Sequence, residues 1–96
     1  MPRVVWTDEA VQDADELERF LLDKSPDAAV RAMLAIYEAT DQLIQFPESG
    51  RPAEGRTPDE RELLIPFGNA GYVLLYRVRP ELVLVLGVKH MSEAGY

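Results

Sequence analysis

Residues Arg61–His90 read RELLIPFGNAGYVLLYRVRPELVLVLGVKH, and this stretch decides the fold. Two short turn-forming segments, Gly68–Gly71 and Arg79–Glu81, divide it into three runs rich in β-branched, aromatic and leucine residues. Runs of this kind with short turns between them predict strands that pair antiparallel with their neighbours. We therefore expect a three-stranded antiparallel meander, with strands at residues 61–67, 72–78 and 82–88.

The second and third of these strands are apolar on both faces, whereas a sheet with one face in water normally alternates apolar and polar residues. Either strong sheet curvature or the long loop folding over it buries the second face, or another chain covers that face. Strand alternation predicts these groups: Tyr72, Leu74, Tyr76 and Val78 against Val73, Leu75 and Arg77 in one strand, and Leu82, Leu84, Leu86 and Val88 against Val83, Val85 and Lys89 in the other.

The first half of the chain predicts one strand and two helices. Arg3–Trp6 is a short β-branched and aromatic run. Thr7 is then a helix N-cap, and apolar residues at helical spacing continue to about Asp23. Ser25-Pro26-Asp27 is a second helix start, and that helix should end at Gln45 or Phe46, before Pro47.

Residues 46–60, FPESGRPAEGRTPDE, are rich in proline and glycine and predict a long loop. The whole chain, residues 1–96, is thus expected to form one α+β domain. It would have an N-terminal strand, an antiparallel helical hairpin and the three-stranded meander. All four strands would form one sheet, with the helices on one face.

Composition excludes several classes of function. The chain has no cysteine and one histidine, which argues against disulfides and against a metal site, and no cofactor-binding motif is present. No segment resembles a signal peptide or a membrane span, so we expect a cytoplasmic protein. The net charge is −7, so direct DNA binding by this chain alone is not expected.

The charge is unevenly distributed along the chain. Residues 1–50 hold four basic and eleven acidic residues, whereas residues 51–96 hold six of each. Any contact with an anionic partner would therefore be local and would use the arginines of the second half.

Six pieces of the sequence, in order and at consistent spacing, resemble the RelE/ParE family of bacterial toxins, with ParE the closer branch. They are VVWTDEAVQDADEL, SPDAA, LIQFPESGRP, REL, YVLLYRV and LVLGVKH, and they are distributed over nearly the whole chain, from Val4 to His90. The resemblance implies helices packed on one face of the sheet. It also implies a toxin of a type II toxin–antitoxin module, neutralised by a cognate antitoxin that wraps around it.

The resemblance leaves the target open between two mechanisms. ParE-like members poison DNA gyrase without known catalysis of their own, and we expect this mechanism here. RelE-like members cleave mRNA on the ribosome, which is the alternative. A non-toxic relative that only binds its antitoxin is a third possibility. After His90 this chain continues MSEAGY, without the basic residues found in many relatives, and this departure disfavours the nuclease.

Candidate catalytic residues for metal-independent RNA cleavage are His90, Arg61 and Arg77, with Glu62 and the terminal Tyr96 also considered. Histidine is the residue type most often used as an acid or base in catalysis, but a lone histidine such as His90 is more often a surface or structural residue. Arg61 and Arg77 would either reach the sheet rim and pair with an acid, such as Glu62 or one on the helices, or bind an antitoxin carboxylate or a phosphate.

Loop arginines are more often solvated than functional. The complete set of candidate antitoxin- or target-binding residues is Arg51, Arg56, Arg61, Arg77, Lys89 and His90. Of these, we predict that at least one of Arg61 and Arg77 contacts an acidic group of the antitoxin.

Overall fold

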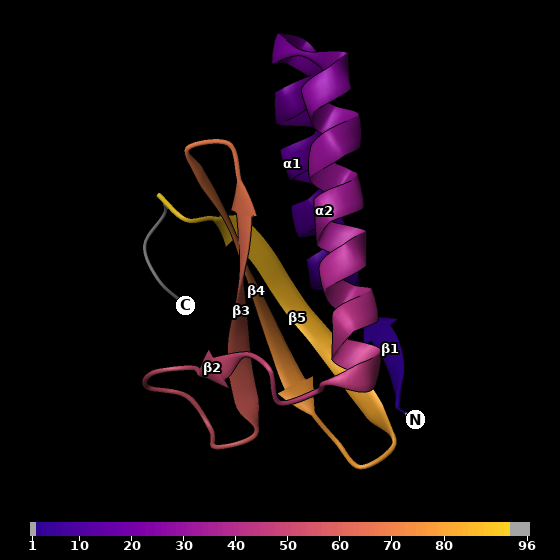
Figure 1. The fold of residues 1–96 in the computed structure, drawn as a ribbon, viewed down its shortest axis with the longest axis vertical. Coiled ribbons are helices and arrows are strands. Elements are labelled where there is room, and N and C mark those ends of the chain that lie inside the picture. Colours follow the sequence, from indigo (N-terminus) through magenta and orange to yellow (C-terminus); the bar gives the residue numbers. More distant parts are fainter. Residues whose placement is uncertain (1, 93–96) are drawn as a thin grey trace.

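The computed structural model describes residues 2–92 and shows two helices packed against one face of a twisted sheet (Figure 1). This is the predicted α+β fold. The elements are β1 (Arg3–Trp6), α1 (Asp8–Lys24), α2 (Pro26–Gln45), β2 (Arg51–Pro52), β3 (Glu60–Phe67), β4 (Ala70–Val78) and β5 (Leu82–His90).

A single serine joins the two helices. The Ser25 N–H donates to the Leu21 carbonyl at 2.7 Å and closes α1, while the Ser25 side chain accepts from the Ala28 N–H at 3.2 Å and opens α2. Thr7 caps α1 in the same way, accepting from the Ala10 N–H at 3.1 Å. The helices therefore begin where the sequence predicts, and the short link holds them antiparallel.

The sheet has five strands in the order β1-β5-β4-β3-β2, which corrects the predicted four. The additional strand, β2, lies inside the segment predicted to be entirely loop, where Arg51 pairs with Glu62 and Pro52 with Arg61. Proline lacks a backbone N–H, so a pattern search discounts it as a strand residue, although it is tolerated at a sheet edge. The N-terminal strand β1 pairs parallel with β5, and the remaining pairs are antiparallel.

A register shift between β4 and β5 corrects one predicted face. Leu75 pairs with Gly87 but Tyr76 pairs with Val85, so Leu86 is an extra residue in β5. A bulge of this kind reverses the alternation beyond it. Val88 was predicted on the face opposite Val83 and Val85, but all three are buried together in the core cluster.

The core lies between the helical hairpin and the sheet, and its largest fully buried side chains are Tyr76, Ile36, Leu43, Leu74, Val83, Val85 and Val88. The apolar residues on the opposite face of the sheet are less exposed to solvent than the sequence pattern suggested. Leu75 is only 2% exposed, and Val73 and Leu84 are half-buried. Glu60, Glu62 and Arg77 share this face by register, and the stems of such long charged side chains shield apolar neighbours.

Candidate functional site

The candidate residues separate into two groups at opposite ends of the sheet. Arg61 pairs with Tyr76 in β4, whereas His90 pairs with Tyr72, four residues away along the same strand. Four residues of strand span roughly 13 Å. Arg77 follows Tyr76 and so points to the other face of the sheet. His90, Arg61 and Arg77 are therefore not brought together.

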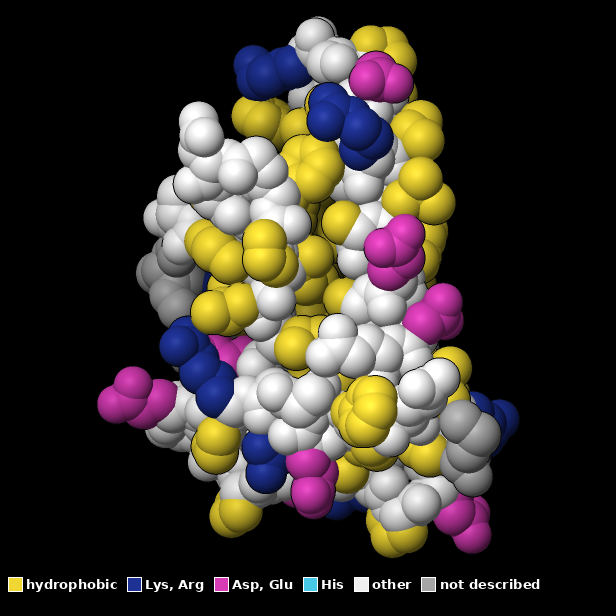
Figure 2. All heavy atoms as spheres, in the orientation of Figure 1, with side chains coloured by type: hydrophobic (Ala, Val, Ile, Leu, Met, Phe, Trp, Pro, Cys, Tyr) yellow, Lys and Arg dark blue, Asp and Glu magenta, His cyan; other side chains and the backbone are white. Residues whose placement is uncertain are grey.

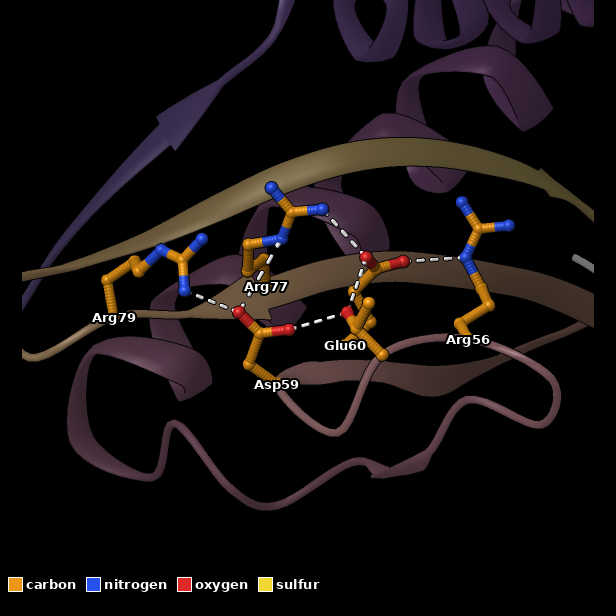
Figure 3. A network of polar contacts seen from close by, with 6 residues as sticks. Arg56, Asp59, Glu60, Arg77 and Arg79 are labelled. Atoms are coloured by element: carbon orange, nitrogen blue, oxygen red, sulfur yellow. Dashed lines mark hydrogen bonds and ion pairs between the residues drawn. The ribbon is translucent and has the colours of Figure 1, made fainter.

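Arg77 belongs to a charged cluster on the face of the sheet away from the helices (Figure 3). Its Nη2 donates to Glu60 Oε2 at 2.7 Å, and Arg56 Nε donates to the other oxygen of Glu60, also at 2.7 Å. Asp59 pairs with Arg79, and its Oδ2 lies 3.8 Å from Arg77 Nε. The cluster consists of Arg56, Asp59, Glu60, Arg77 and Arg79.

Glu60 is the centre of the charged cluster and is only 4% exposed. Hydrogen bonds from Arg77, Arg56 and Thr57, in decreasing order of effect, lower its pKa from 4.5 to about 2. Hydrogen bonds to the charged form of a carboxyl favour ionisation, and here they outweigh the opposing effect of burial. Glu60 therefore stays ionised at any physiological pH.

The acid that pairs with Arg77 differs from the one predicted. Glu62 and the acids of the helices were the expected partners. The register places Glu60 directly opposite Arg77, while Glu62 lies opposite Leu75 and accepts from Arg51 Nε at 2.6 Å. Glu60 was missed because the predicted strand began one residue later, at Arg61.

Arg61 holds the segment before β2 against the sheet. Its Nη1 donates to the Gly50 carbonyl at 2.7 Å and, more weakly, to the Glu48 carbonyl at 3.4 Å. The Gly50 N–H in turn donates to the hydroxyl of Tyr76, which is fully buried, at 2.9 Å. Both arginines that were singled out in the sequence thus have partners within the chain.

The second group of candidates borders a groove of about 720 Å³ beside α1, which we call the α1–β5 groove. His90 lies on its rim, with its ring edge-on to Tyr72 at 5.7 Å between centroids. The His90 Nδ1 accepts from the Ser92 N–H at 3.1 Å, which fixes the ring. The groove is lined by Asp13, Glu16, Leu17, Phe20, Leu21, Phe67, Tyr72, Val88, Lys89, His90 and Ser92.

The α1–β5 groove combines an apolar floor with a polar rim. Such a surface can hold an apolar side chain of a partner while the rim orients it. Asp13 is held in place because its carboxylate accepts from the Val88 N–H at 3.1 Å. Apolar residues at helical spacing predicted the helix that carries Leu17, Phe20 and Leu21, but this pattern does not indicate that they border a groove. Tyr96, which was also considered, lies outside the described residues.

A second, smaller groove of about 380 Å³ separates α2 from β3, and we call it the α2–β3 groove. Figure 2 shows it as a hollow with hydrophobic side chains along its floor. Because β2 pairs only with Arg61 and Glu62, β3 has an open edge from Leu63 onward within the described sheet. The groove is lined by Ala35, Glu38, Ala39, Gln42, Leu63, Leu64, Ile65 and Pro66.

No group of three or more His, Cys, Asp or Glu side chains within residues 2–92 is placed to hold a metal ion. Neither described helix is long and apolar enough to cross a membrane.

The chain is similar to known toxins. A family model described as the ParE toxin of the type II toxin–antitoxin system parDE matches residues 4–95. Toxin RelE3 of Caulobacter vibrioides is 39% identical over 84 residues, which cover 88% of each chain. Putative toxin Y4kP of Sinorhizobium fredii is 36% identical over 91 residues, which cover 95% of this chain and 90% of that protein.

A solved structure has the same fold. It is described as the chromosomal ParDE TA system from P. aeruginosa, and one of its chains superposes with a TM-score of 0.74. The superposition covers 94% of this chain and 96% of that one, at 22% sequence identity.

Proposed function

Because the chain belongs to the ParE toxin family of type II toxin–antitoxin systems, we propose that it inhibits DNA gyrase and is neutralised by a cognate antitoxin. The observation that carries the choice of target is the separation of His90, Arg61 and Arg77 described above. RNA cleavage without a metal needs a base, an acid and a cation around one phosphate. The separated residues favour inhibition by binding over catalysis.

The target is tested with purified protein and purified gyrase. We expect the protein to reduce supercoiling and to accumulate cleaved DNA that remains attached to gyrase. Cells that express it should form filaments and show DNA damage, while bulk mRNA stays intact. An unaffected supercoiling reaction over a range of toxin concentrations would contradict the gyrase proposal.

The second candidate is a ribosome-dependent mRNA endonuclease, and relatives named RelE favour it. In that case, expression would produce prompt cleavage of mRNA at ribosomal A-site codons. If neither gyrase nor mRNA is affected but the antitoxin still binds, the chain is the non-toxic relative considered above.

For the antitoxin we propose the α2–β3 groove as a docking site. An open strand edge offers backbone N–H and C=O groups to an extended segment, and the adjacent apolar groove accepts its side chains. The edge of β3 from Leu63 to Phe67 and the groove beside it meet both requirements. The acidic surface and the internally paired arginines also support a partner that binds mainly through apolar and backbone contacts.

Ala35→Arg tests this docking site because Ala35 lines the groove from α2. The arginine side chain would fill the groove, and we expect antitoxin binding to weaken at least about tenfold, or about 1.4 kcal/mol. Gln45→Arg is the matched control, since Gln45 is exposed near the end of the same helix and does not line the groove. Equal affinity of the Ala35→Arg variant and the control would place the antitoxin elsewhere.

A further inference from the structure

The surface of the helical hairpin carries large apolar side chains that are about half exposed to solvent, and one of them, Tyr37, contacts the Trp6 ring edge-on. On α2, Val30, Leu34 and Tyr37 are 59%, 54% and 53% exposed, and on α1, Val11 and Leu22 are 46% and 47% exposed. We call these five residues the hairpin stripe. Single exposed apolar residues are ordinary on protein surfaces, but a group of them on one face marks an interaction site.

Helical spacing places the stripe on one face. At 100° per residue, Val30, Leu34 and Tyr37 lie within about 60° of one another around the axis of α2. They are rotated by roughly 130° from the mean direction of the buried residues of that helix. Val11 and Leu22 lie within about 20° of each other around the axis of α1 and are rotated by roughly 100° from the mean direction of its core-facing residues. Figure 2 shows hydrophobic side chains along the right-hand edge of the hairpin, away from the sheet.

The stripe is bordered by acidic residues. Asp15 and Glu18 lie between Val11 and Leu22 on the same line of α1; Asp15 is exposed and Glu18 is partly exposed. On α2 the line continues to Asp41. Within residues 2–92, none of these three carboxylates forms an ion pair that would neutralise it.

Two of the three basic residues of the hairpin, Lys24 and Arg31, lie off this face. Lys24 is 4.9 Å from the centroid of the Phe20 ring, and Arg31 is 5.9 Å from that of Phe67; these two aromatic residues border the α1–β5 groove. Arg19 lies at the edge of the face, because it is four residues after Asp15 and three before Leu22 on α1. The face is therefore apolar at its centre and negative at its borders.

We propose that the hairpin stripe docks a basic amphipathic helix of a partner protein. Two antiparallel helices present a furrow into which the side chains of a third helix fit. Lysine or arginine beside its apolar residues would meet Asp15, Glu18 and Asp41. A second copy of this chain would bring the same acids against one another, which opposes self-association through this face.

This surface is distinct from the proposed antitoxin groove. Ala35 and Ala39 border the α2–β3 groove. They are rotated about the axis of α2 by about 100° or more from the residues of the stripe. Both surfaces can be occupied at once. The proposal is independent of whether gyrase or mRNA is the target.

The experiment uses the purified full chain and two fluorescent helical peptides. Both peptides carry leucines along one face, but one has lysines and the other glutamates at the flanking positions. We expect the lysine peptide to bind at least about tenfold more tightly, with a ratio that shrinks as salt screens the charges. Equal binding of the two peptides would overturn the proposal.

Variants of the chain localise the binding. Val30→Ser combined with Leu34→Ser should weaken the lysine peptide at least about tenfold, and Asp15→Lys with Glu18→Lys should reverse the preference between the peptides. Phe46→Ser is the control, because Phe46 is 61% exposed but lies just beyond α2 and borders neither groove. Circular dichroism checks that each variant folds.

Three further results would overturn the proposal. The first is a loss of binding in the Phe46→Ser control equal to that in the stripe variant. The second is an unchanged preference between the peptides after both acids are replaced by lysine. The third is self-association of the wild-type chain in sedimentation that the Val30→Ser and Leu34→Ser changes abolish, because a second copy would then be the occupant.

Discussion

At the scale of single residues, Gly50 and Tyr76 connect the start of the β2 segment to the centre of the core. A Cβ atom at Gly50 would lie 2.6 Å from the Tyr76 hydroxyl and 2.6 Å from the Glu62 carbonyl oxygen. The backbone can approach the sheet this closely only because residue 50 has no side chain. The tyrosine hydroxyl, buried under the helices, then accepts a hydrogen bond from that backbone.

Tyr76→Phe removes the acceptor and leaves the Gly50 N–H without its partner. We expect the free energy of unfolding to fall by about 1–3 kcal/mol, because an unpaired buried donor loses its hydration without compensation. Urea denaturation measures this change. Tyr37→Phe is the control, since Tyr37 is 53% exposed, and it should change stability by less than about 0.5 kcal/mol. Equal effects of the two changes would show that the Gly50 bond contributes nothing.

Glu60 makes the free energy of unfolding depend on pH in the acidic range. Its pKa is about 2 in the folded chain and 4.5 as the ordinary value. Because the folded pKa is lowered, the contribution of Glu60 is complete above pH 4.5 and is lost as the pH falls toward 2. Glu60→Gln should therefore destabilise the chain by about 2 kcal/mol at pH 7, with a smaller difference at pH 3.

Urea titrations at several pH values measure the Glu60 effect. Glu54→Gln is the matched control, since Glu54 is exposed in the loop before the charged cluster. A wild-type minus Glu60→Gln difference that stays constant between pH 7 and pH 3 would contradict the role assigned to the ionised carboxylate.

At the scale of elements, Ser25 ends one helix and begins the next. Ser25→Ala removes the side-chain cap of α2 while keeping the backbone bond to Leu21 that closes α1. We expect a loss of about 1 kcal/mol, and Ser25→Gly should lose only a few tenths. Thermal unfolding followed by circular dichroism measures both. A larger loss in Ser25→Gly than in Ser25→Ala would mean that the rigidity of the link matters more than the cap.

The same elements show what can be predicted from sequence. Thr7, Ser25 and Pro26 carry their signals locally, so both helices begin where expected. The extra residue Leu86 has no local signal, because a leucine in an apolar run is equally compatible with regular pairing. Its position depends on how β4 and β5 pack under the helices, and that is a tertiary effect.

The candidate site was only partly predictable for a related reason. The sequence identified Arg77 as a charge inside an apolar strand, but its partner depends on the β3–β4 register, which aligns it with Glu60. Similarly, Arg61 was recognised as unusual, yet its acceptors are carbonyls of Glu48 and Gly50, which side-chain patterns do not indicate. Residue type identifies unusual positions, whereas register and loop path decide what they contact.

At the scale of the whole molecule, the chain leaves several large apolar side chains in water. We expect the isolated protein to bind apolar dyes and to have limited solubility. An antitoxin that binds only the folded chain adds about 2.7 kcal/mol at one hundred times its dissociation constant. That corresponds to a rise in Tm of more than about 10 °C for a chain of this size.

Differential scanning fluorimetry with increasing antitoxin measures this shift, and the Ala35→Arg variant should shift less at the same antitoxin concentration. A monodisperse isolated chain that binds no dye would contradict the first expectation. An unchanged Tm at saturating antitoxin would contradict the second.

The pairing of β1 with β5 has a consequence for synthesis. Residue 3 aligns with residue 82, and β1 lies at the edge of the described sheet with β5 as its neighbour. During translation the first strand emerges long before the strand that it pairs with. A ribosome that stops before β5 is made releases a chain in which β1 has no strand to pair with. Such a fragment is expected to be degraded rather than to poison the cell. The topology thus delays completion of the sheet until nearly all of the described chain has been translated.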